Sequence, residues 1–107
     1  MKILYHPDFP MDVLRFATQY GEISPKLETR FRAEVDEALA RIKSGPTAAG
    51  HFLNIGSTIV TDVRRRNLVS FPQFVLYGLH GDFVVIGALI PSASDPLTWL
   101  SRFTKPA

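Results

Sequence analysis

The sequence predicts an α+β fold in which an N-terminal helical hairpin packs on a small antiparallel sheet of about four strands, in the order β-α-α-β-β-β-α. In the first half, apolar residues recur at helical spacing, and in the second half runs of β-branched and aromatic residues take over. Helices and strands grouped in this way are typical of α+β folds rather than wound α/β folds. The 107 residues predict one domain, 1–107, because halves of about 50 residues would bury too little apolar surface to fold alone.

The N-terminal half is expected to hold one strand and two helices. Residues 1–5 are apolar and β-favouring, which predicts a strand. An amphipathic pattern then predicts a helix over about 8–20 that ends at Gly21. Ser24, which a proline follows, predicts the start of a second helix, and Gly45 predicts its end. The short link makes the two helices antiparallel neighbours.

The C-terminal half is expected to hold the rest of the sheet and a short last helix. Residues 47–56 predict a loop, and His80-Gly81-Asp82 predicts a hairpin turn between two apolar runs. Pro96, after a capping serine and aspartate, predicts the start of the last helix. The expected strands are Thr58–Val63, Leu68–Phe71, Phe74–Leu79 and Phe83–Ile90.

The positive charge is concentrated in the second half of the chain. Residues 1–54 hold seven Lys/Arg and seven Asp/Glu, so the net charge of +2 belongs to residues 55–107, where Arg64, Arg65 and Arg66 are adjacent. In an extended chain alternate side chains point to opposite faces, so at least one of Arg64 and Arg65 is expected to face away from the helices. An exposed arginine can hold phosphate bidentately and stack on a base, whereas charges on a sheet edge can also simply prevent unwanted strand pairing.

Other side chains give weaker indications of chemistry. His6, His51 and His80 lie far apart without metal-ligand spacing, there is no cysteine, and no phosphate-binding glycine loop occurs, so we expect no metal and no cofactor. His80 could carry a proton at a hairpin tip, or be a solvated turn residue. Tyr77 could stack on a base or transfer a proton, although an aromatic residue in a strand is more often part of the core. Trp99 is expected to be a packing anchor.

The expected location of the protein follows from features that its sequence lacks. No segment near the N-terminus predicts a signal peptide, and no window approaches the roughly 18–20 apolar residues that a membrane span needs. The absence of cysteine fits a reducing compartment. We therefore expect a cytoplasmic protein with no membrane partner.

The order of several short motifs extends over nearly the whole chain. The motifs are the hairpin that closes with Ile42 and Pro46, then Val63-Arg64-Arg65-Arg66, then Phe71-Pro72-Gln73-Phe74-Val75-Leu76-Tyr77, then the strand to Ala88-Leu89, then Asp95-Pro96 with Trp99 and Arg102. In this order the chain resembles the RelE/ParE superfamily of toxins from bacterial type II toxin–antitoxin modules. Many relatives carry a histidine and one or two arginines where this chain has Pro91, Ala93 and Ser94.

The resemblance implies a RelE/ParE-like fold and a toxin that inhibits growth, takes part in plasmid stabilisation and is neutralised by a cognate antitoxin protein. It favours a ParE-like inhibitor of DNA gyrase or another non-nuclease member, because the basic residues of RNA-cleaving relatives are missing. The alternatives are a RelE-like endoribonuclease that cuts mRNA on the ribosome, and a degenerate, non-toxic binding protein of the same fold. A homodimer, or a heterotetramer with the antitoxin, is compatible with the resemblance.

Two overlapping groups of residues are the candidates for function, and they leave open whether the protein is an enzyme. Neither group includes a convincing base for RNA cleavage. The catalytic candidates are Arg64, Arg66, Tyr77, His80 and Arg102, and the candidates for binding a target or partner are Arg64, Arg65, Arg66, Arg102 and Lys105.

Overall fold

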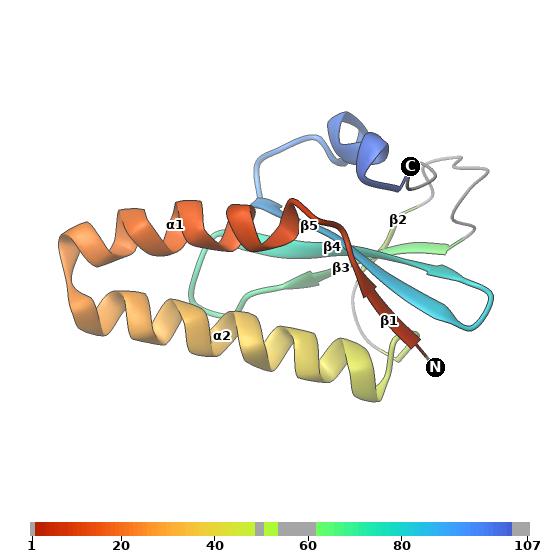
Figure 1. The fold of residues 1–107 in the computed structure, drawn as a ribbon, viewed down its shortest axis with the longest axis horizontal. Coiled ribbons are helices and arrows are strands. Elements are labelled where there is room, and N and C mark those ends of the chain that lie inside the picture. The colour runs from red at the N-terminus through yellow and green to blue at the C-terminus, as the bar shows by residue number, and fades with distance from the viewer. Residues whose placement is uncertain (1, 49–50, 54–61, 104–107) are drawn as a thin grey trace.

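The computed structural model describes residues 2–48, 51–53 and 62–103, and shows an α+β arrangement of two helices and a mixed sheet (Figure 1). The helical hairpin comes first along the chain, after one strand, and a short 3₁₀ helix ends the described part. The elements are β1 (Lys2–Tyr5), α1 (Phe9–Ile23), α2 (Pro25–Ser44), β2 (His51–Leu53), β3 (Asp62–Asn67), β4 (Gln73–His80), β5 (Phe83–Pro91) and η1 (Pro96–Phe103).

The five strands lie in the order β1-β5-β4-β3-β2. Strands β2 to β5 pair antiparallel with their neighbours, whereas β1 pairs with β5 in parallel, from Lys2 opposite Phe83 to Tyr5 opposite Ile86. The expectation of a purely antiparallel sheet is therefore wrong. The reason is that β1 is separated from β5 by the helical hairpin and three strands, and so has the long connection that parallel pairing requires.

The two faces of the sheet have separate apolar cores. Both helices pack on one face, and η1 lies on the other side, as Figure 1 shows for α2 and η1 with the strands between them. On β4 the alternation is regular: Val75 and Tyr77 face the helices, while Phe74 and Leu76 face η1. Every side chain of β3 is thereby assigned to one face or the other by its register with β4.

A bulge at Gly87 changes the alternation along β5. Leu76 pairs with Ala88 and Tyr77 pairs with Ile86, so Gly87 has no opposite residue. A Cβ atom there would lie 2.8 Å from Cζ of the Phe103 ring, so a larger residue would force the ring or the strand to shift. The bulge therefore allows η1 to pack closely against β5.

Several element boundaries differ from the expected ones in the first half of the chain. Helix α1 continues past Gly21 to Ile23, so Gly21 lies within the helix and does not end it. The start of α2 is confirmed: Ser24 Oγ accepts a hydrogen bond from the Leu27 amide.

In the second half, the arginine run lies inside β3 instead of between strands, and residues 51–53 form β2 where a loop was expected. Leu68–Phe71 is a turn rather than a strand, because the Leu68 amide donates to the Gln73 carbonyl and closes it (3.0 Å). The last helix is 3₁₀ rather than α. Residues 58–61 of the first expected strand lie outside the described residues.

Candidate functional site

The three arginines of β3 are divided between the two faces of the sheet. Arg64 pairs with Tyr77 and Arg66 pairs with Val75, so both arginines lie on the face that the helices cover. Arg65 lies on the other face, with its guanidinium 4.7 Å from the centre of the Phe74 ring, a cation–π contact. The expectation that at least one of Arg64 and Arg65 faces away from the helices is confirmed for Arg65.

Arg64 is tied to two neighbouring segments. Its Nε donates to both carboxylate oxygens of Asp62 (3.1 and 3.3 Å), and its Nη1 donates to the Thr47 carbonyl (2.8 Å). Charge-assisted contacts of this kind fix the guanidinium in place. Arg64 therefore links the middle of the sheet to the segment that follows α2.

Tyr77 is a core residue with a fixed hydrogen bond. Its side chain is 1% exposed, and its hydroxyl donates to the Pro46 carbonyl (2.8 Å). Burial raises the pKa of the Tyr77 hydroxyl above its ordinary value, and the charges of Arg64 and Arg66 lower the pKa in part. A buried, protonated phenol that already donates is not placed to stack on a base, so the interpretation as a core residue fits its surroundings.

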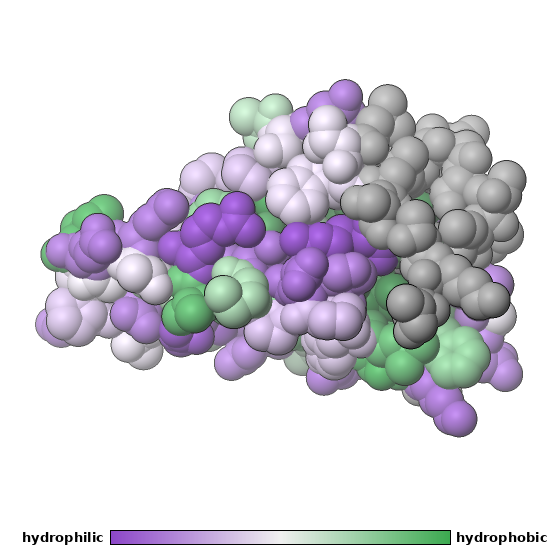
Figure 2. All heavy atoms as spheres, turned by 45° about the horizontal axis from the view of Figure 1, so that its top comes forward, coloured by the Kyte–Doolittle hydropathy of each residue, from purple (hydrophilic) through white to green (hydrophobic). Residues whose placement is uncertain are grey.

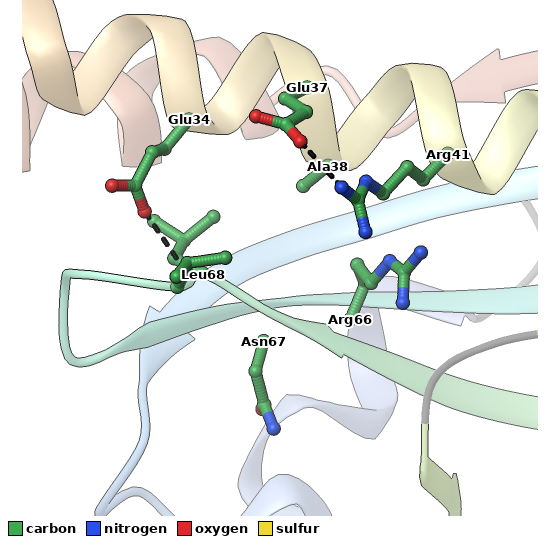
Figure 3. A pocket seen from close by; sticks show the side chains of 8 residues that line it. Glu34, Glu37, Ala38, Arg41, Arg66, Asn67 and Leu68 are labelled. Carbon is green, nitrogen blue, oxygen red and sulfur yellow. Dashed lines mark hydrogen bonds and ion pairs between the residues drawn. The ribbon is translucent and has the colours of Figure 1, made fainter.

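Arg66 lines a pocket of about 90 Å³ between α2 and β3. Figure 3 shows Arg41 of α2 and Arg66 pointing toward each other across it. The Nη2 of Arg41 donates to Glu37 (2.7 Å), and Glu34 accepts from the backbone amides of residues 69 and 70 (3.0 and 2.9 Å). The lining residues are Glu34, Glu37, Ala38, Arg41, Arg66, Asn67, Leu68 and Val69.

The α2 side of this pocket was not predicted from the sequence. Glu34, Glu37 and Arg41 are spaced three and four residues apart, which places them on one face of a helix. That spacing was the available indication in the sequence that the three side chains lie together. The spacing alone does not show that this face of α2 meets β3 at Arg66.

Arg102 forms a buried ion pair with Asp12 of α1. Its Nη1 donates to Asp12 Oδ2 (2.9 Å) and to the Gly87 carbonyl (3.0 Å), and its Nη2 donates to Asp12 Oδ1 (3.1 Å). The Leu89 amide also donates to Asp12 Oδ2 (3.1 Å). The Asp12 side chain is 1% exposed, so Arg102 is held by internal contacts on several sides.

The side chains of this ion pair satisfy backbone groups at the edge of β5 beyond the end of β1. Pairing of the two strands ends at Tyr5, with a last bond from the His6 amide to the Ile86 carbonyl (2.8 Å). Farther along β5, the Gly87 carbonyl receives its bond from Arg102 and the Leu89 amide donates to Asp12. The two side chains thus supply the donor and acceptor that another strand would supply. The sequence indication for Asp12 was a carboxylate within the buried stripe of α1.

The remaining candidates do not join the arginines. His80 is exposed beside the β4–β5 turn, where Gly81 has φ of 58°, and strand alternation places it on the face opposite Arg64 and Arg66. Lys105 lies outside the described residues. Within residues 2–48, 51–53 and 62–103, no group of three or more His, Cys, Asp or Glu side chains could hold a metal ion, and no helix is long and apolar enough to cross a membrane.

The surface on the side of Figure 2 is mixed in character. Hydrophilic residues occupy the middle of this face, and hydrophobic ones form small separate groups. The molecule is thus a small α+β domain with a mixed sheet, a helix-covered arginine pair and an ion-paired sheet edge. No protein-family model matches the sequence, and no curated protein matches it.

Proposed function

We propose that this protein is the toxin component of a type II toxin–antitoxin module, RelE/ParE-like in fold, which a cognate antitoxin neutralises and which acts without cleaving RNA. The motif order from the helical hairpin to Trp99 supports the family, and the succession of a strand, a helical hairpin and an antiparallel run of strands is compatible with it. A ParE-like action on DNA gyrase is the favoured form.

The proposal that the toxin does not cleave RNA is supported by the separation of the candidate catalytic groups. RNA cleavage by transphosphorylation needs a base, an acid and cations on one phosphate. Here Arg102 is bound to Asp12, Arg64 is bound to Asp62, and His80 lies on the opposite face from both Arg64 and Arg66. The titratable hydroxyl opposite Arg64 in the sheet register is that of Tyr77, which is buried and has a raised pKa. A toxin built on this surface would act by binding.

The proposal is tested by induced expression in a bacterial host, with the same gene carrying an early stop codon as the control. We expect growth arrest with intact mRNA, accumulation of gyrase-linked DNA breaks, and recovery when a small neighbouring gene is co-expressed. Arrest with mRNA cut at fixed codon positions would instead support the ribonuclease. Normal growth at high expression would support the non-toxic binding protein and overturn the proposal.

A further inference from the structure

The pocket between α2 and β3 holds a guanidinium that has no counterion among residues 2–48, 51–53 and 62–103. Arg66 is half-buried, and it makes no hydrogen bond or ion pair with any residue that the structure describes. It lines the pocket together with Arg41, which forms an ion pair with Glu37 (2.7 Å; Figure 3). Two like charges that face each other across a small space repel, and an anion between them would remove that repulsion.

We propose that this pocket receives one carboxylate side chain of a protein partner, which inserts between Arg41 and Arg66 while an adjoining apolar side chain of the partner covers Val69. The inference rests on the proposed function only in that the antitoxin would be such a partner. Arginine suits this role because its planar fork binds a carboxylate through two parallel hydrogen bonds.

Charge favours a single carboxylate over a nucleic-acid backbone. The pocket volume of about 90 Å³ is enough for a carboxylate or a phosphate group, so the choice between them depends on charge. Its lining has two glutamates and two arginines, so their formal charges sum to zero. A chain of phosphates would bring further negative charge close to Glu34 and Glu37, whereas a single carboxylate can approach Arg66 alone.

The rim of the pocket provides the apolar part of the surface. Val69 is 85% exposed, although it is a large hydrophobic residue next to the buried Leu68. Its backbone is held in place, because Glu34 accepts hydrogen bonds from the amides of both Val69 and Ser70. The rim is therefore ordered before a partner arrives, which lowers the entropy cost of binding.

The test uses the 107-residue protein and two synthetic probes. One probe is an acetylated, amidated peptide with one glutamate between two leucines, and the other is the same peptide with glutamine. NMR titration follows the side-chain Nε–Hε signals of Arg41 and Arg66 and the amide of Val69. We expect these signals to shift with the glutamate peptide and to shift at least tenfold less with the glutamine peptide at equal concentration.

Variants identify the group that binds. Arg66→Gln should weaken binding of the glutamate peptide at least tenfold, and Arg66→Lys should give an intermediate loss, because charge is kept without the bidentate fork. Arg32→Gln is the matched control, since Arg32 is exposed on the opposite side of α2, and it should leave binding unchanged. Amide spectra of all variants establish that they are folded.

The outcomes separate this inference from the proposed function. Equal binding of both peptides, or full binding by the folded Arg66→Gln variant, would overturn it. A larger response to a single-stranded oligonucleotide, suppressed by Arg66→Gln, would do the same and would assign the pocket to nucleic acid. Glutamate-peptide binding at Arg66 by a protein that does not arrest growth would support the pocket and contradict the toxin.

Discussion

Removal of the Asp12 carboxylate should be among the most damaging single changes in the described part of the chain. In Asp12→Ala, the Arg102 guanidinium loses two hydrogen bonds and its counterion, and the Leu89 amide loses its acceptor. Among the described residues, Arg102 keeps the Gly87 carbonyl and the face of Trp99, 5.1 Å from the ring centre. The variant thus leaves a largely buried cation and an unpaired amide at the edge of β5.

The expected cost follows from the burial of the pair. Removal of one partner of a buried ion pair costs about 3–5 kcal/mol, because the remaining charge is uncompensated. The third contact of Asp12, with Arg15, adds little, since the Arg15 side chain is 53% exposed and screened by water. We expect a loss of about 3–5 kcal/mol, which lowers the melting temperature by more than roughly 12 °C in a domain of this size.

Urea unfolding followed by circular dichroism measures this cost, and a double-mutant cycle assigns it. Asp12→Ala/Arg102→Ala should cost less than the sum of the single variants by at least about 1.5 kcal/mol, because no unpaired charge remains. Asp36→Ala, an exposed aspartate of α2, should change stability by less than about 0.5 kcal/mol. A cost under about 1 kcal/mol for Asp12→Ala, or additive single variants, would refute this account of the β5 edge.

Three further changes test other parts of the structure. Gly87→Ala should destabilise the protein by about 1–3 kcal/mol in thermal unfolding, because its Cβ overlaps the Phe103 ring. In the double variant, Phe103→Leu should recover part of that loss. Equal costs of Gly87→Ala with Phe103 and with Leu at that position would contradict the overlap. Tyr77→Phe should cost about 1 kcal/mol at pH 7. Because the pKa of Tyr77 is raised in the folded protein, its contribution to stability is complete below its ordinary pKa of 10.0 and is lost as the pH rises above it. The wild type should therefore lose stability faster than Tyr77→Phe as the pH rises beyond 10. Parallel curves of stability against pH for the two proteins would count against this. Glu34→Ala should speed hydrogen exchange at the Ser70 amide, because that amide loses its acceptor. Glu34→Gln keeps an acceptor oxygen and should speed the exchange less. Unchanged exchange in both variants would show that the Glu34 carboxylate does not hold the Leu68–Phe71 turn.

Both long helices and the β4–β5 hairpin were predicted from local pattern, whereas the expected strand Leu68–Phe71 is absent and β2 was not expected. The helical hairpin depends on contacts within about four residues and on the Ser24 cap, and the β4–β5 hairpin depends on the turn at Gly81. The alternation of β3 also follows from local geometry, since any extended segment separates Arg64 from Arg65. Local rules sufficed for these features because every determining contact is close in sequence.

The features that could not be predicted depend on long-range contacts. Nothing local places β1 beside β5, and the ion pair joins Asp12 to Arg102, 90 residues later. The Leu68–Phe71 segment has strand-like composition, yet Glu34 of α2 accepts its amides and holds it as a turn. In each case a distant partner overrides the local preference.

The arginine run shows how the tertiary structure changes the meaning of a sequence motif. As a sequence, three adjacent arginines suggest one cationic patch, but the pleat and the helices give each a different environment. Arg64 is bound to Asp62, Arg65 lies against Phe74, and Arg66 lines a pocket together with Arg41. Since the first two already have favourable neighbours, a substitution at Arg64 or Arg65 disturbs the fold as well as any binding. Neither Arg65 nor Arg66 has a carboxylate partner among the described residues, but Arg65 lies against the Phe74 ring whereas Arg66 lines the pocket beside α2. Arg66 is therefore the position at which binding can be tested separately from stability.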